Sequence, residues 1–338
     1  MEGGDVVHLD PFELFRPDSV EAAVGLASRL GPGSVDFLAG GTDLLPNYKM
    51  HLNPRPNLVA LWDIPELARR SPAFLGSMTR LNDLVEDAQV ASAFPGVVAA
   101  ACEVATPLVR SSATVGGNLL VETRCFFFNQ SFPWRQSLGF CLKAEGDRCH
   151  VVPQRERCYA TFSGDLAPAL MAVDASVEVA GPAGRRRVTV EELYDPNGDG
   201  IRRHRLAPGE ILVGAHLPHE SRGLSATYRK LRVRPAFDFP ELGVAVALRT
   251  EGADVSYLRV AVGGLETYPR RFDALTDPVV GHPLTDDRIA ALGEAVRAAV
   301  HPVHNTFLAP EYRRKMAGVF VRRALREARD ASTARPAP

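Results

Sequence analysis

The stretch Leu38-Ala-Gly-Gly-Thr-Asp-Leu-Leu-Pro46 places two adjacent glycines directly after a short apolar run. That run, residues 35–39, is typical of a buried strand that ends in a glycine turn. Glycine has no Cβ, so the backbone N–H groups of such a turn stay open and form a concavity that binds pyrophosphate. A pair of glycines is more often a plain turn, and both interpretations stay open for this stretch alone.

A second glycine turn, Ala113-Thr-Val-Gly-Gly-Asn118, follows a helical pattern over residues 81–105. It has the same open backbone, with a hydroxyl and an amide side chain beside it. The common nucleotide fingerprints, G-x-G-x-x-G and G-x-x-x-x-G-K-[ST], are missing. A Rossmann dinucleotide site and a P-loop are therefore not expected.

The overall composition is that of an ordinary globular protein, with 338 residues, 46% of them hydrophobic, and a net charge of -1. These values exclude collagen, coiled coil and general disorder. A nearly neutral chain has no basic field, so nucleic acid and membrane surfaces are poor candidate partners. We find no apolar stretch long enough for a transmembrane helix and no leader pattern near Met1, and we expect a cytoplasmic protein.

The length predicts about two domains. After Pro218 the pattern changes to strands, expected over residues 226–233, 243–249 and 258–263, followed by helices over 286–300 and 310–328. We place a boundary near residues 219–224, between a first domain over 5–222 and a second over 224–330. The tail, residues 331–338, is expected to be disordered.

Residues 121–162 show no sustained period and carry four of the five cysteines, Cys125, Cys141, Cys149 and Cys158. Their spacing lacks the C-x2-C pairs of zinc ribbons. Four thiolates of any spacing can close a tetrahedral zinc site, and a [4Fe-4S] cluster also needs four. The fifth, Cys102, lies on an apolar helix and is expected to be a small buried hydrophobe.

Two turns are expected after the insertion. The arginines 185–187 are expected to form a solvated turn, and residues Asp195 to Gly200 are expected to form a turn without metal.

The two glycine turns with their flanks resemble the FAD-binding subunits of the molybdenum hydroxylase family, which includes carbon monoxide dehydrogenase medium subunits and the flavin domain of xanthine dehydrogenase. The resemblance continues in residues 163–168, 209–212, 228–232 and 312–316 and covers nearly the whole chain. It implies an α+β fold: a two-subdomain FAD-binding domain, an iron-sulfur insertion at 121–162 and a C-terminal domain of a sheet plus helices.

The resemblance also implies the FAD contacts. The pyrophosphate would lie between one turn, formed by Ala39, Gly40, Gly41, Thr42, Asp43 and Leu44, and a facing turn, formed by Thr114, Val115, Gly116, Gly117 and Asn118. Asp165 resembles the family acid that binds the cofactor, although it could equally cap a helix starting at Leu166. Leu212 and Lys230 match positions against the flavin, where a cation favours the reduced ring. The alternative for Lys230 is a surface lysine on a strand.

The insertion is similar to that of 4-hydroxybenzoyl-CoA reductase β subunits, in residues 124–131, 134–135, 141–143, 146–150 and 158–160. This similarity implies a [4Fe-4S] cluster on the four cysteines and an electron-transfer role beside a large molybdopterin subunit and a small [2Fe-2S] subunit. Reduced ferredoxin would drive reductive dehydroxylation to benzoyl-CoA, with no substrate chemistry on this chain. The alternatives are the FAD subunit of an oxidative hydroxylase for another aromatic or heterocyclic substrate, and a zinc-stapled flavin-binding assembly module.

Overall fold

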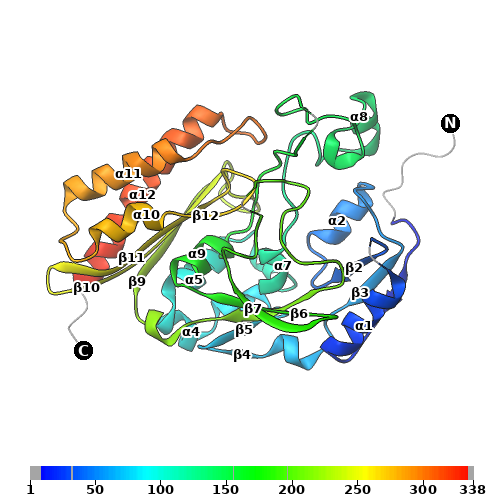
Figure 1. Cartoon of the computed structure of the whole chain (residues 1–338), viewed down its shortest axis with the longest axis horizontal. Coiled ribbons are helices and arrows are strands. Elements are labelled where there is room, and N and C mark those ends of the chain that lie inside the picture. Colours follow the sequence, from blue (N-terminus) through cyan, green and yellow to red (C-terminus); the bar gives the residue numbers. More distant parts are fainter. Residues whose placement is uncertain (1–8, 32, 155, 196, 334–338) are drawn as a thin grey trace.

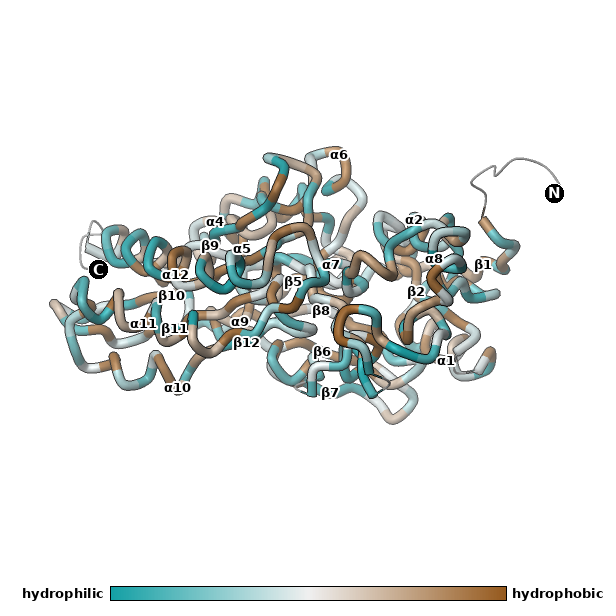
Figure 2. Tube along the Cα trace, turned by 90° about the horizontal axis from the view of Figure 1, so that it is seen from above, coloured by the Kyte–Doolittle hydropathy of each residue, from teal (hydrophilic) through white to brown (hydrophobic). Residues whose placement is uncertain are grey.

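The computed structural model describes residues 9–31, 33–154, 156–195 and 197–333. Three sheets follow one another through the molecule, which is elongated in both views (Figures 1 and 2). The first strands with α1 and α2 lie at one end, and the C-terminal sheet with α11 and α12 lies at the other.

The N-terminal sheet is parallel, in the order β1-β3-β2. Its strands are β1 (Glu13–Phe15), β2 (Val35–Leu38) and β3 (Asn57–Ala60), and its helices are α1 (Val20–Leu30) and α2 (Leu44–Lys49). Ser19 caps α1 by accepting from the Ala22 N–H, and Gly31 ends it with a positive φ of 90°. The first glycine turn lies between β2 and α2, as the sequence predicts.

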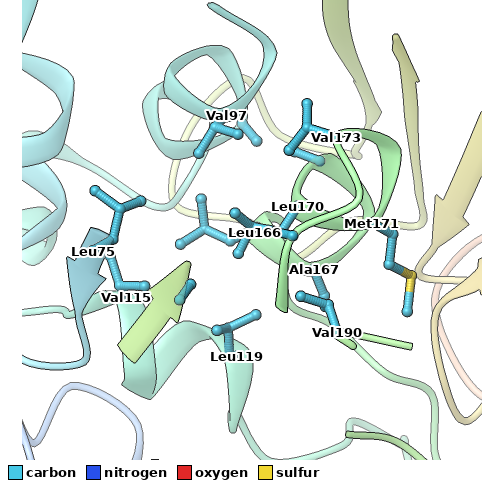
Figure 3. Packing of buried hydrophobic residues seen from close by; sticks show 14 of the residues in the cluster. Leu75, Val97, Val115, Leu119, Leu166, Ala167, Leu170, Met171, Val173 and Val190 are labelled. Carbon is cyan, nitrogen blue, oxygen red and sulfur yellow. The ribbon is translucent and has the colours of Figure 1, made fainter. Parts of the chain in front are cut away.

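The second sheet has the order β4-β5-β8-β6-β7. Its strands are β4 (Arg70–Ser71), β5 (Phe74–Gly76), β6 (Ser176–Gly181), β7 (Gly184–Thr189) and β8 (Ile211–His216). The accompanying helices are α3 (Leu81–Val85), α4 (Ala88–Ala93), α5 (Pro95–Cys102), α6 (Pro107–Arg110), α7 (Val115–Leu119) and α9 (Leu166–Ala172). Figure 3 shows the main core, where Leu166 and Leu170 of α9 lie among Leu75, Val97, Val115 and Leu119.

Two expectations about this domain are wrong. Arg185, Arg186 and Arg187 do not form a turn but lie in the edge strand β7, exposed and paired with carboxylates or a histidine of neighbouring segments. Charged side chains are common on edge strands, because they discourage pairing with another chain. Cys102 is exposed at the last residue of α5 rather than buried.

The C-terminal sheet is antiparallel, in the order β12-β11-β10-β9. Its strands are β9 (Ser225–Leu231), β10 (Leu242–Glu251), β11 (Asp254–Gly263) and β12 (Arg270–Arg271), with helices α10 (Asp273–Thr276), α11 (Asp286–Ala299) and α12 (Pro310–Thr333). Helix α12 packs on β9 and β10, while α5 and α9 also contact this sheet. The expected division near 219–224 falls between β8 and β9 and stays a prediction.

The C-terminal helix is longer than expected. It continues to Thr333, so residues 331–333 of the expected disordered tail are helical, and residues 334–338 lie outside the described part of the chain. Among the described residues, no helix is long and apolar enough to span a membrane.

The insertion, residues 121–162, contains little regular structure. Only α8 (Phe132–Ser137) and a 3-10 turn, Leu142–Ala144, interrupt its described loops. It projects beside α2, away from the three sheets (Figure 1). A small apolar cluster of its own holds it together, formed by Leu52, Cys125, Phe128, Cys141, Ala144, Cys158 and Ala160.

Candidate functional site

The two glycine turns meet backbone to backbone. A Cβ added to Gly40 would lie 1.7 Å from the carbonyl oxygen of Ser112, just before the second turn. Such a distance is far inside van der Waals contact, so no side chain fits at this position. Gly41 has a positive φ of 69°, which glycine adopts without strain. The first turn therefore requires both glycines for its shape and for its approach to the second.

The second turn opens the short helix α7. Thr114 caps it, with the hydroxyl accepting from the Gly117 N–H at 3.1 Å. Gly116 packs against β5, since a Cβ there would lie 2.7 Å from that of Ser77. A Cβ on Gly117 would approach only the Thr114 hydroxyl, so this side of the turn is open. The turn thus combines a fixed backbone with an open face.

Two buried hydroxyls beside the second turn have no hydrogen-bond partner among the described residues. They belong to Ser77 and Thr79, whose carbonyl groups accept from the N–H groups of Gly116 and Val115. An unsatisfied buried polar group costs about 1–3 kcal/mol, and a ligand with oxygen atoms in this turn would satisfy such groups. Sequence reasoning missed both residues, because a serine and a threonine after a short strand carry no distinctive pattern.

Asn118 joins the second turn to the start of α9. Its Oδ1 accepts from the Leu166 N–H at 2.9 Å, and a Cβ on Gly164 would lie 2.6 Å from its carbonyl oxygen. Asn118, rather than Asp165, therefore satisfies the first turn of α9. The side chain of Asp165 makes no capping bond, so the capping interpretation of that residue is wrong.

Asp165 forms a buried ion pair with Lys230 of β9. Its Oδ2 lies 3.0 Å from Lys230 Nζ, and its Oδ1 accepts from the Tyr228 hydroxyl at 2.7 Å. Burial raises the pKa of Asp165, and the charges and hydrogen bonds of Lys230 and Tyr228 oppose that rise. The Lys230 side chain is 1% exposed and also donates to the Glu103 carbonyl oxygen, which excludes the alternative of a surface lysine.

The remaining predicted FAD residues lie on the elements around these groups. Leu212 is buried in β8, on which α7 packs, within the same core cluster as Val115. Thr42 is exposed beside the half-buried Ala39, Gly40 and Gly41. Leu44 begins α2 and packs against the apolar cluster of Leu38, Tyr48 and Leu58.

Asp43 faces the insertion. Its Oδ2 accepts from the Glu122 N–H at 3.0 Å, and its carboxylate pairs with Arg124, the residue before Cys125. The first glycine turn and the cysteine segment are therefore directly connected.

The described residues together fit FAD. Two glycine turns meet, and one of them has an open backbone face with two unsatisfied hydroxyls beside it. A buried cation is held on β9.

The four insertion cysteines line one cavity. Cys125, Cys141, Cys149 and Cys158 are all buried, and the phenyl rings of Phe127 and Phe128 share the wall with them. Burial raises the pKa of Cys125 to about 12 and that of Cys158 to about 11, and the neighbouring thiols contribute to both shifts. The structure brings all four predicted ligands together.

These thiols do not form a recognisable metal-binding group in the described part of the chain. All four are free thiols, and no group of three or more His, Cys, Asp or Glu residues that could hold a metal ion is found in the described ranges. His150 lies beside the cavity with its Nε2 2.9 Å from the Phe140 carbonyl oxygen. The four cysteines line one cavity, but the absence of a metal-binding group among the described residues does not support the expected cluster, which stays a proposal.

Distant parts of the chain hold the cysteine segments. The Gly200 N–H, at the end of the turn from Asp195, donates to the Cys158 carbonyl oxygen at 2.9 Å. Asn305 is buried before α12; its side chain donates to the Tyr159 carbonyl oxygen at 2.6 Å, and its own carbonyl accepts from the Phe126 N–H at 3.1 Å. Sequence reasoning missed these contacts, because each joins segments that lie far apart in the sequence.

Two family models match the chain. The FAD binding domain in molybdopterin dehydrogenase matches residues 10–220, and the CO dehydrogenase flavoprotein C-terminal domain matches residues 226–328. The aldehyde oxidoreductase FAD-binding subunit PaoB of Escherichia coli K12 is 31% identical over 88% of this chain and 94% of its own length. The carbon monoxide dehydrogenase medium chain of Hydrogenophaga pseudoflava is 29% identical over 94% and 96%.

Solved structures agree with these relatives. The carbon monoxide dehydrogenase structure from Hydrogenophaga pseudoflava covers 96% of this chain and 99% of its own with a TM-score of 0.76 and 27% identity. The expected closeness to 4-hydroxybenzoyl-CoA reductase in particular is not shown by these relatives. The mixed α/β fold is that of the carbon monoxide dehydrogenase flavoprotein, and the chain belongs to the FAD-binding oxidoreductase subunits of the molybdenum hydroxylase family.

Proposed function

We propose that this chain binds FAD between its two glycine turns and serves as an electron-transfer subunit. The observation that carries the proposal is the backbone contact of Gly40 with Ser112, which places one glycine turn against the segment leading into the other. The proposed FAD contacts are Ala39, Gly40, Gly41, Thr42, Asp43, Leu44, Thr114, Val115, Gly116, Gly117, Asn118, Asp165, Leu212 and Lys230. When bound, FAD accepts and donates one or two electrons.

The Asp165–Lys230 pair has the most specific role in this proposal. The carboxylate and the Glu103 carbonyl oxygen fix the ammonium group of Lys230 in one place. A fixed cation favours a neighbouring group that gains negative charge, because the buried site has a lower effective dielectric constant than water. We infer that Lys230 stabilises the reduced cofactor. Asp165 holds the Lys230 side chain in position, and Tyr228 in turn donates to Asp165.

We further propose a [4Fe-4S] cluster held by Cys125, Cys141, Cys149 and Cys158. Four buried thiols and aromatic side chains around one cavity support this interpretation, since such a wall keeps water from the sulfurs and shapes the reduction potential. A single zinc ion needs ligand sulfurs at about 2.3 Å from the metal in a tight tetrahedron. Four thiols can also close such a tetrahedron, so zinc stays the alternative, and the metal content of the protein decides between the two.

The complex would contain a large molybdopterin subunit and a small [2Fe-2S] subunit and would be cytoplasmic. We propose an oxidative hydroxylase in which substrate reacts on the large subunit and electrons leave through the FAD of this chain. The similarity to an aldehyde oxidoreductase FAD-binding subunit and to carbon monoxide dehydrogenase medium chains supports this direction. The substrate class proposed is an aromatic or heterocyclic compound, including aromatic aldehydes.

A second candidate is the reductive direction, with reduced ferredoxin as donor and 4-hydroxybenzoyl-CoA as substrate. The observation that favours it is the four-cysteine cavity of the insertion, which would give low-potential electrons an entry close to the FAD turn. Its proposed product is benzoyl-CoA, in anaerobic degradation of aromatic compounds.

Absorbance of the flavin in the purified complex distinguishes the two directions. In the oxidative case, aromatic aldehydes or heterocycles bleach the flavin without any added reductant, and reduced ferredoxin with 4-hydroxybenzoyl-CoA gives no benzoyl-CoA. In the reductive case, reduced ferredoxin reduces the flavin and benzoyl-CoA accumulates. A complex that contains no flavin would contradict both candidates and the electron-transfer proposal itself.

A further inference from the structure

Lys143 is a buried lysine in the wall of the cysteine cavity. Its side chain is 3% exposed, and lysine is almost never buried to this extent without partners. Its Nζ donates to Glu122 Oε1 at 2.5 Å and to the Gly200 carbonyl oxygen at 3.0 Å, and it also contacts the Thr123 hydroxyl. Three acceptors therefore hold the ammonium group in one position.

These acceptors lie in the cysteine segments or are hydrogen-bonded to one. Thr123 lies two residues before Cys125, and Lys143 lies two residues after Cys141. Gly200 donates its N–H to the Cys158 carbonyl oxygen at 2.9 Å, so one residue accepts from Lys143 and donates to a cysteine segment. The ammonium group consequently lies where three of the four cysteine segments meet.

The ammonium group also lies against an aromatic wall of the cavity. Its Nζ is 4.7 Å from the centre of the Phe128 ring, which lines the cavity together with the four cysteines. Arg135 is the other buried cation among the described residues of the insertion, but its Nη2 donates to the carbonyl oxygens of Met50 and His51. Among the described residues of the insertion, Lys143 is thus the buried cation whose ammonium group is held next to the cysteine segments.

We propose that Lys143 is a positioning residue that raises the reduction potential of the four-cysteine site, with Glu122 as the carboxylate that fixes it and opposes its effect. The inference rests on the proposed cluster. One-electron reduction adds one negative charge to the site, with the electron supplied by an external reductant and no bond formed or broken at Lys143. A fixed cation stabilises that charge and a fixed carboxylate destabilises it, strongly so at low effective dielectric constant.

The test is a redox titration followed by electron paramagnetic resonance, with dithionite as reductant and the full chain in its native complex. Lys143→Gln should lower the midpoint potential and Glu122→Gln should raise it, each by a tenfold or larger change in the reduction equilibrium, about 59 mV for one electron. Lys143→Arg should stay near the unmodified protein. Arg202→Gln is the matched control, because Arg202 lies two residues after Gly200 but its side chain is 80% exposed.

Shifts of opposite sign for Lys143→Gln and Glu122→Gln support the inference, because a merely structural role gives no reason for opposite signs. No shift in either variant, or shifts of the same sign, overturn it. If Lys143→Gln does not retain iron, the Glu122→Gln variant decides. A higher midpoint potential in that variant supports the inference, and an unchanged or lower potential overturns it. Absence of iron and labile sulfide from the unmodified chain contradicts the proposed cluster instead, so the two failures are distinguishable.

Discussion

Asp165, at the start of α9, and Lys230, in β9 of the C-terminal sheet, form a buried ion pair. Their Oδ2 and Nζ atoms are 3.0 Å apart, and the two side chains are 4% and 1% exposed. A pair with a proposed role at the flavin therefore also joins α9 to the C-terminal sheet.

Breaking this pair should destabilise the fold. Lys230→Met leaves the Asp165 carboxylate buried without its cation, and removing one partner of a buried pair costs about 3–5 kcal/mol. Asp165→Asn together with Lys230→Met should recover a large part of that loss. Urea unfolding of the single and double variants measures it. Additive single effects would contradict a direct interaction between the two residues.

Gly40→Ala should abolish flavin binding, because its Cβ would overlap the Ser112 carbonyl oxygen and push the two glycine turns apart. The matched control is Gly25→Ala in α1, where the new Cβ meets only the far end of the Arg29 side chain at 3.6 Å. Alanine is about 1 kcal/mol better than glycine in a helix, so the control should fold normally and keep its flavin. The ratio of flavin to protein checks both. A Gly40→Ala variant with full flavin content would show that the turns do not hold the cofactor.

Asn305→Ala should loosen the cysteine segment around Cys158. The change leaves the Tyr159 carbonyl oxygen and one N–H of Arg313 without their partner, at about 1–3 kcal/mol for each buried group. Hydrogen exchange of residues 158–161 should become faster. Asn82→Ala removes a similar bond to a carbonyl oxygen, that of Pro107, at an exposed site and serves as the control. Unchanged exchange in the Asn305 variant would refute this role.

The stability of the fold should depend on His204 between about pH 6.5 and pH 4. Burial, with the nearby charge of Arg203, lowers the pKa of His204 to about 4. The unfolded chain then binds a proton at higher pH than the folded chain does, so stability is full above pH 6.5 and falls as the pH decreases through this window.

His204→Asn should flatten that part of the pH profile, measured by urea unfolding at several pH values. His219→Asn is the matched control, because the His219 side chain is exposed. If the His204 variant and the unmodified chain lose stability in parallel between pH 6.5 and pH 4, His204 does not carry this dependence.

Local patterns predicted the regular elements well. The apolar spacing after Ser19 and the stop at Gly31 correspond to the observed ends of α1. The two glycine turns lie where the sequence predicts, because a glycine pair after an apolar run depends on neighbouring residues only. The four cysteines of the aperiodic segment line one cavity, and their role as cluster ligands stays a prediction.

The errors arose where distant segments decide the local structure. Arg185 to Arg187 form a strand because β6 offers its edge and carboxylates from α1 and β6 receive Arg185. Asp165 does not cap α9, because Asn118, 48 positions from Leu166, supplies the acceptor. Ser77, Thr79 and Asn305 were missed for the same reason, since only the folded chain brings them to the turns and to the insertion.

The most direct test of the central claim is the flavin, iron, labile sulfide and zinc content of the full chain purified without oxygen. The account predicts about one FAD with about four irons and four sulfides per chain, as for a single cubane cluster. Zinc without iron would keep the FAD site and contradict the cluster. A chain that folds but binds no FAD would contradict the central claim.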